Sequence, residues 1–228
     1  MNSHLRTRTG GNGTMALLVI AAAQLLIVMD GTIVTVGLPV IGSGLRIAAS
    51  DLDWVLTAYA LAFGGMLPAA GRAGDVFGRR RLFRAGLVVF LLSSLLGGPA
   101  QNGGILIAAR VVQGVGGAIV APAALSPLAD TFPAGPRRDR ALGVYGAMGG
   151  LGSVVGLLLG GALTEYLGWR WIMFVNVPFA LVVLAGTAAV CTRQPPARRD
   201  RPARRGHRDS RARVTGLHDQ PGRVRRPR

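Results

Sequence analysis

The sequence is short of the residues on which soluble proteins rely. It has no lysine, since its 26 strongly basic residues are all arginines, and its single cysteine excludes an intrachain disulfide and a cysteine metal cluster. Only 16% of the residues are charged, whereas 50% are hydrophobic. A soluble domain of this length carries more charge and spreads it more evenly. The composition therefore indicates a membrane protein.

Motifs of soluble enzymes are also absent. The sequence contains no Walker-type phosphate loop, no nucleophile elbow and no pair of histidines at metal-ligand spacing. Its histidines, His4, His207 and His218, all lie outside the long apolar segments. We therefore expect no enzyme, no metal site and no cofactor.

What the sequence has instead is a series of six apolar segments, each about twenty residues or longer. Such segments cross a hydrocarbon core of about 30 Å as helices. They lie at residues 15–41, 54–74, 82–100, 104–129, 140–164 and 171–191. The sequence thus predicts an N-terminal segment (1–14), a six-helix transmembrane bundle (15–191) and a tail (192–228).

Arginines set the expected orientation of these spans. The tail holds 13 arginines and three acids out of a formal net charge of +16, a composition that predicts disorder. In the short loops, arginines gather at residues 6–8, 79–84 and 137–140 on one side, whereas the other side receives only Arg46 and Arg170. Short arginine-rich loops stay in the cytoplasm. We therefore expect a multi-pass protein of the inner (cytoplasmic) membrane with both termini in the cytoplasm.

Two ionisable residues lie inside the apolar segments. Asp30 lies just past the middle of the first segment, and Arg110 lies about two turns into the fourth. A charge at such a depth costs about 2.5–3.5 kcal/mol on insertion scales, so each side chain needs a polar cavity or a partner. Counting about 1.5 Å per residue places the two roughly 7 Å apart in depth, which long side chains or one water can bridge. A carboxylate that gains and loses a guanidinium neighbour can release and take up a proton.

Other interpretations of these residues stay open. Arg110 is near enough to the outer end of its segment to extend its guanidinium to the membrane surface. Asp30 can also bond to the backbone of its own helix and bend it. Gln113, one turn from Arg110 on the same helix face, favours a polar cavity.

Glycines recur in the fifth apolar segment. Gly152, Gly156 and Gly160 are spaced by four residues, so they fall on one helix face and permit close approach of a neighbouring backbone. With the adjacent Gly161 they form the expected glycine packing face. A static contact and a sliding contact both fit this pattern.

Four motifs follow one another along the chain, at residues 29–39 on the first segment, 71–81 in the hinge after the second, 106–118 on the fourth and 152–161 on the fifth. In this order they resemble the motifs of the major facilitator superfamily, and in particular of its fourteen-span drug:proton antiporter branch. The hinge reads Gly-Arg-Ala-Gly-Asp-Val-Phe-Gly-Arg-Arg-Arg and is similar to the family's signature loop. Leu157 stands where the branch has a proline in its antiporter motif.

The resemblance implies roles for specific residues. By this resemblance, the residues that take part in proton coupling or substrate binding are Asp30, Thr32, Arg110 and Gln113. The residues that form a cytoplasmic gate loop are Gly71, Asp75, Gly78, Arg79 and Arg80.

The resemblance also implies a fold and a function. The fold is one six-helix half, made of two three-helix repeats, of a transporter with two such halves. The function is proton-coupled efflux of drug-like or antibiotic small molecules, driven by the proton gradient without a cofactor. Transport would then need a C-terminal half or a second copy, because nothing after Cys191 is long and apolar enough to span a bilayer. The alternative is a truncated or frame-shifted membrane protein that does not transport, or an interaction module.

The expected partners follow from the same considerations. They are protons, a small-molecule substrate and the lipid bilayer. The tail is expected to attract anionic lipids through its arginines. No aromatic residues are interleaved with these arginines for base stacking, so we expect no nucleic acid.

Overall fold

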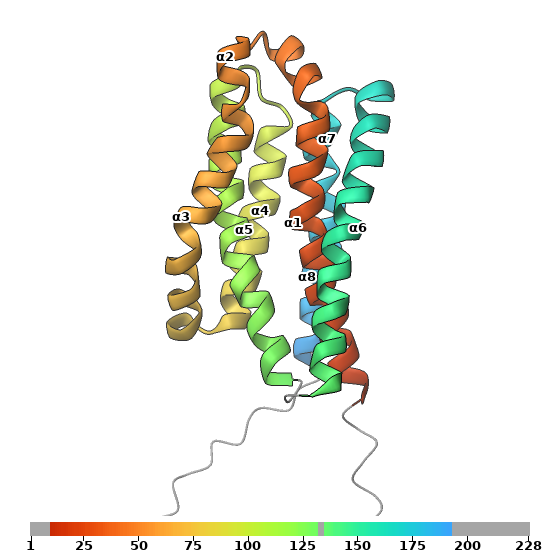
Figure 1. Cartoon of the computed structure of the whole chain (residues 1–228). Helices are drawn as coiled ribbons and strands as arrows, with labels where there is room; N and C mark the ends of the chain where they lie inside the picture. Colours follow the sequence, from red (N-terminus) through yellow and green to blue (C-terminus); the bar gives the residue numbers. More distant parts are fainter. Residues whose placement is uncertain (1–9, 132–134, 193–228) are drawn as a thin grey trace, which may run out of the picture. The chain divides into compact units, whose positions relative to one another are not determined.

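Helices form nearly all of the described chain. The computed structural model describes residues 10–131 and 135–192 (Figure 1). Its helices are α1 Gly10–Leu45, α2 Ala49–Leu52, α3 Trp54–Phe77, α4 Arg79–Gly97, α5 Gly103–Thr131, α6 Pro136–Tyr166, α7 Arg170–Phe174 and α8 Asn176–Thr192. The predicted all-α fold is confirmed. The predicted disorder of the tail falls on residues outside the described ones, and the limits of the three predicted regions remain predictions.

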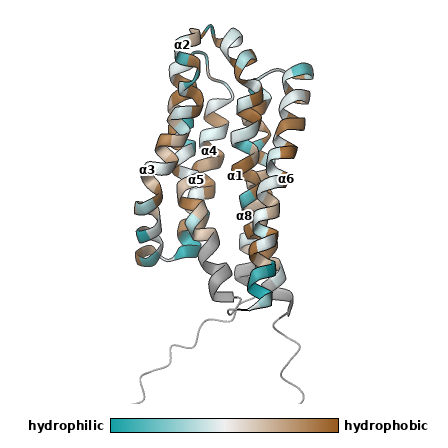
Figure 2. Ribbon diagram, viewed as in Figure 1, coloured by the Kyte–Doolittle hydropathy of each residue, from teal (hydrophilic) through white to brown (hydrophobic). Residues whose placement is uncertain are grey.

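Five stretches of the described chain are long and apolar enough to cross a membrane. They are Thr14–Leu45, Ala49–Phe77, Gly103–Ala124, Pro136–Tyr166 and Arg170–Ala188. The third predicted span, which corresponds to α4, is not among them, because four of the first six residues of α4 are arginines. Its remaining turns are apolar and pack against α5 and α8. Figure 2 shows hydrophobic residues along the helices and hydrophilic ones mainly near their ends.

The helices gather in two groups within the bundle. In one group α5 packs along both α3 and α4, and in the other α1 packs along α6 and also contacts α8 (Figure 1). The groups meet through contacts of α1 with α5 and of α4 with α8. Each of the two predicted three-helix repeats contributes to both groups. Residues of α1 and α5 that are far apart in the sequence are thereby brought together.

Glycines allow α6 to lie directly against α1. A Cβ atom at Gly156 would lie 2.8 Å from the carbonyl oxygen of Met29, and one at Gly152 would lie 2.8 Å from that of Leu25. Gly160 lies on the same face, and all three of these glycines are buried. Gly161 does not belong to this face, contrary to the prediction, because a Cβ there would have no atom within 4 Å. One residue turns an α-helix by about 100°, which points Gly161 away from α1.

The last predicted span is interrupted near its start. Helix α7 ends at Phe174 and α8 begins at Asn176. Pro178 explains the interruption, because it has no N–H to donate to the carbonyl of Phe174 four residues earlier. The interruption places Asn176 in the first turn of α8, where its side chain is fully buried.

Candidate functional site

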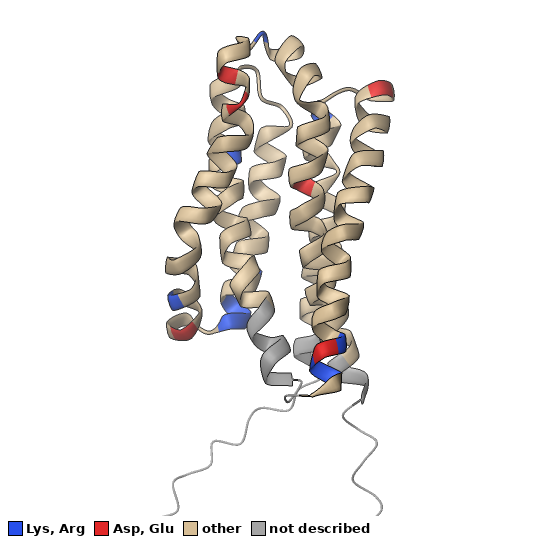
Figure 3. Cartoon of the chain, in the orientation of Figure 1, with Lys and Arg blue, Asp and Glu red and all other residues tan. Residues whose placement is uncertain are grey.

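The candidate site is centred on an ion pair between α1 and α5. The Arg110 NH1 group lies 2.7 Å from Asp30 Oδ2, and both side chains have no exposed surface. Figure 3 shows most of the charged residues at the two ends of the bundle, with few between them. The structure therefore joins directly the two residues that the sequence places at similar depth.

Gln113 connects the two partners of this ion pair. Its Oε1 accepts a hydrogen bond from Arg110 NH1 at 2.6 Å, and its Nε2 donates to Asp30 Oδ1 at 2.8 Å. The same Nε2 donates to Ser94 Oγ of α4 at 2.9 Å. Residues spaced by three lie on one helix face, which is why Arg110 and Gln113 both point at Asp30.

Asn176 is a member of this network that the sequence analysis missed. Its Nδ2 donates to Asp30 Oδ1 at 2.7 Å, and the residue is fully buried. The available signal was an amide side chain within an apolar segment, where polar residues need partners. Ser94 was missed as well, because a serine can also bond to its own helix, and here its Oγ does donate to the carbonyl of Phe90.

The remaining contacts of Arg110 hold it inside the bundle. Its Nε donates to the carbonyl oxygen of Val55 at 3.3 Å, and its guanidinium carbon lies 4.3 Å from the centre of the Tyr59 ring. A side chain held in this way does not extend to the membrane surface. The hydrogen bonds described for Asp30 likewise come from other helices, so in this structure it does not act as a device that bends α1.

The chemistry of this network follows from its burial. A buried charge pair is strongly destabilised when one partner is removed, by about 3–5 kcal/mol, because the other charge is left uncompensated. Asp30 and Arg110 lie on helices of different groups, so a relative movement of the groups would separate them. The arrangement therefore joins a carboxylate and a guanidinium that a relative movement of the two helix groups would part.

Thr32 is not part of the network. Its hydroxyl donates to the carbonyl of Val28 within α1 at 3.0 Å. It lines an open cleft of about 430 Å³ together with Tyr59 and Phe63 of α3 and Leu157 of α6. Thr32 lies two residues after Asp30, which turns it to another side of the helix. Tyr59 connects the two features, because it lines the cleft and also covers Arg110.

The predicted gate loop forms a tight turn between α3 and α4. Gly78 alone separates the two helices, and its φ of +89° is a conformation that favours glycine. Arg79 NH2 lies 3.0 Å from Asp75 Oδ1, and both side chains are exposed. Gly71 lies inside α3, where a Cβ would meet no atom within 4 Å, and Arg80 follows in the first turn of α4. The structure thus places the loop at an end of the bundle, away from the buried network.

Comparison with known proteins shows which proteins the chain is similar to. The chain is 52% identical to the puromycin resistance protein pur8 of Streptomyces alboniger over 170 residues, which cover 75% of this chain and 34% of that protein. It is 44% identical to the cephamycin export protein CmcT of Amycolatopsis lactamdurans over 185 residues, which cover 81% of this chain and 38% of that protein. The chain thus spans a little over a third of the length of these curated relatives.

A solved structure shows the same fold. It is the inward-facing, unoccupied form of a bacterial homolog of the human lysosomal transporter Spinster, with a TM-score of 0.66 and 22% sequence identity. The match covers 82% of this chain and 44% of that one. A family model described as Major Facilitator Superfamily matches residues 20–224, which is most of the chain. The chain therefore belongs to the Major Facilitator Superfamily.

Proposed function

We propose that this chain forms the N-terminal bundle of a proton-coupled efflux transporter for drug-like or antibiotic small molecules. The observation that carries the proposal is the fully buried pair of Asp30 and Arg110. Ionisable residues inside membrane helices are costly and usually serve transport. The names of the relatives, which describe puromycin resistance and cephamycin export, support efflux as the direction of transport and antibiotics as the class of substrate.

Proton coupling follows from a movement that opens the pair. With the pair closed, the Asp30 carboxylate lies 2.7 Å from the Arg110 guanidinium. When α1 and α5 separate, the carboxylate takes up a proton and becomes neutral. Closing the pair again expels this proton. The substrate would occupy the cleft beside Tyr59, whose ring covers Arg110. For antiport, substrate binding would favour the closed pair and so expel the proton.

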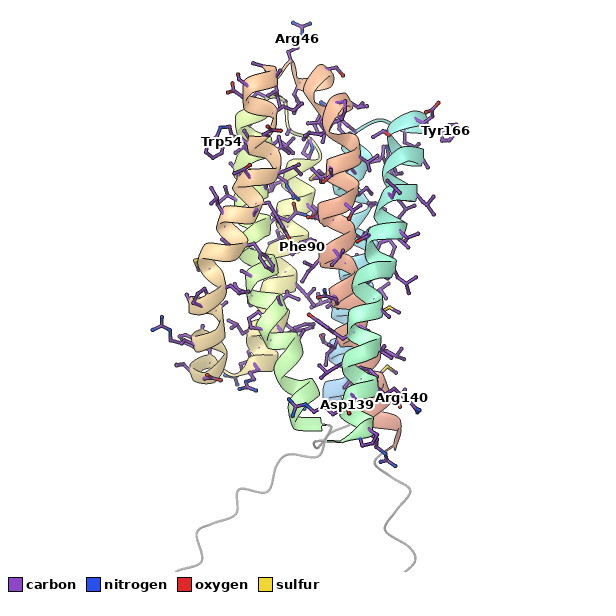
Figure 4. All side chains as sticks on the ribbon, viewed as in Figure 1. Arg46, Trp54, Phe90, Asp139, Arg140 and Tyr166 are labelled. Atoms are coloured by element: carbon purple, nitrogen blue, oxygen red, sulfur yellow. The ribbon has the colours of Figure 1, made fainter. Side chains whose placement is uncertain are left out.

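The proposed orientation places both termini in the cytoplasm of the inner membrane. Figure 4 shows Asp139 and Arg140 at one end of the bundle and Arg46 and Tyr166 at the opposite end. The arginine-rich first turn of α4 and the start of α6 would face the cytoplasm, in agreement with the positive-inside rule.

The partners required for this function are also part of the proposal. Transport by rocking needs a second bundle, either a C-terminal half or a second copy of this chain. The Asp75 to Arg79 turn would form the cytoplasmic gate against that second bundle. The arginines of the tail would hold anionic lipids of the cytoplasmic leaflet.

Transport in inverted membrane vesicles tests the proposal. The chain is produced together with the C-terminal segment of the puromycin resistance relative, and uptake of puromycin is followed after an inward-acidic proton gradient is imposed. We expect gradient-dependent uptake that Asp30→Asn abolishes and that Asp75→Asn reduces. Absence of uptake with either this segment or a second copy of the chain would favour the alternative of a membrane protein that does not transport.

A further inference from the structure

We propose that Asn176 is the hydrogen-bond acceptor of neutral Asp30, a positioning residue whose single amide serves both charge states of the carboxyl group. The inference rests on the proposed function, because it concerns the same proton site. It adds a residue on α8 to a site otherwise built from α1, α4 and α5.

The first observation is an unused acceptor beside Asp30. The amide of Asn176 donates from Nδ2 to Asp30 Oδ1 at 2.7 Å. Its other terminal atom, Oδ1, is buried and has no hydrogen-bond partner among the described residues. Buried polar atoms nearly always have partners, so one that lacks a partner needs an explanation. Our explanation is that Asn176 Oδ1 accepts a hydrogen bond when Asp30 is protonated.

The second observation is that the other acceptors nearby are occupied. Protonation adds one H⁺ to a carboxylate oxygen of Asp30, breaks no covalent bond and creates an O–H donor. Gln113 Oε1 already accepts from Arg110 NH1 at 2.6 Å, and Ser94 Oγ already accepts from Gln113 Nε2 at 2.9 Å. A half-turn about the last torsion of Asn176 exchanges Nδ2 and Oδ1 without moving the backbone. This half-turn presents the free oxygen to the new donor.

The surroundings of Asp30 contain few other groups that respond to pH. Arg110 faces it from α5, and Tyr59 of α3 is stacked on that guanidinium. The residues that the other helices place near Asp30 are Ser94 of α4, Gly156 of α6 and Asn176 of α8. The hydroxyl of Tyr59 also lacks a described partner, but it lies against Gly117, two turns along α5 from Arg110.

Infrared difference spectroscopy during a pH titration tests the inference on the full chain of 228 residues in lipid bilayers. The C=O band of neutral Asp30 is identified by its loss in Asp30→Asn. In Asn176→Leu we expect this band to shift to higher frequency, because the O–H has lost its acceptor. The matched control is Thr187→Val, which removes a hydroxyl on the same helix that donates only to the carbonyl of Leu184 at 2.6 Å. This control should leave the band in place.

A second measurement uses the unaltered chain, so that it does not depend on the folding of a variant. With isotope-labelled asparagine, acidification should lower the amide C=O frequency of one asparagine as its oxygen gains a hydrogen bond. An Asp30 band that keeps its frequency in Asn176→Leu, or the absence of any asparagine shift, overturns the inference and leaves the proposed function intact. Absence of an Asp30 band at every pH overturns both the inference and the proton role of Asp30.

Discussion

The ring of Tyr59 lies 4.3 Å from the guanidinium carbon of Arg110, so one residue both lines the cleft and covers the buried cation. A desolvated cation held over an aromatic face gains about 2 kcal/mol or more. The hydroxyl of Tyr59 has no hydrogen-bond partner among the described residues. The aromatic face, and not the hydroxyl, is therefore the important part of this side chain.

Two substitutions of Tyr59 separate the contribution of its ring from that of its hydroxyl. We expect Tyr59→Leu to lower the free energy of unfolding by about 2 kcal/mol, because the cation–π contact is lost. Tyr59→Phe keeps the aromatic face and should leave stability nearly unchanged. Unfolding of both variants in detergent by increasing SDS measures the difference. Equal losses in the two variants would show that the hydroxyl, and not the ring, holds Arg110.

The ion pair predicts strong coupling between its two residues. Arg110→Met leaves the buried carboxylate of Asp30 uncompensated and should lower the free energy of unfolding by about 3–5 kcal/mol. Asp30→Leu leaves the cation uncompensated and should have a similar effect. The double variant removes both charges and should be clearly more stable than the sum of the two losses predicts. Additive losses in the SDS titration would contradict a direct buried pair.

The contact between α6 and α1 can be tested by comparing a glycine that packs against α1 with a glycine of α6 that does not. A Cβ at Gly156 would lie 2.8 Å from the carbonyl oxygen of Met29, so Gly156→Ala should force the helices apart and cost about 1–3 kcal/mol. Gly161→Ala is the matched control, because no atom lies within 4 Å of its added Cβ. Thermal unfolding of the two variants measures the difference. Equal melting temperatures would place the helix contact elsewhere.

The turn between α3 and α4 depends on Gly78. Its φ of +89° is strained for any residue with a Cβ, so Gly78→Ala should cost about 1–3 kcal/mol. Gly71→Ala changes a glycine within α3 that has open space around it, and it should not destabilise the chain. Limited proteolysis at the turn compares the two variants. Faster cleavage of Gly71→Ala than of Gly78→Ala would contradict this view of the turn.

The sequence predicts the helices well because apolar length is a strong signal. Five of the six expected segments each correspond to one helix, and the last corresponds to α7 and α8 together. The expected depths of Asp30 and Arg110 allow the contact that the structure shows. Helix ends are less predictable: α1 begins at Gly10 instead of residue 15, since glycine and asparagine carry no apolar signal there. The interruption at Val175 was also not expected, although Pro178 is its cause.

The composition of the site could be predicted only in part. Asp30 and Arg110 stand out because a charge in an apolar segment needs a partner. Asn176 and Ser94 carry no charge, so only the packing of α8 and α4 shows that they reach the same site. Gly161 illustrates the opposite error, since sequence proximity to Gly160 does not place a residue on the same helix face, whereas the predicted role of Thr32 in proton coupling or substrate binding stays a prediction.

Proton release on substrate binding tests the central claim most directly, that Asp30 exchanges a proton in response to substrate. Puromycin is added to the purified chain, assembled with the C-terminal segment of its relative, in weakly buffered detergent solution, and the change in pH is recorded. The account predicts that the unaltered chain releases protons and that Asp30→Asn releases none. Equal proton release from both proteins would contradict it.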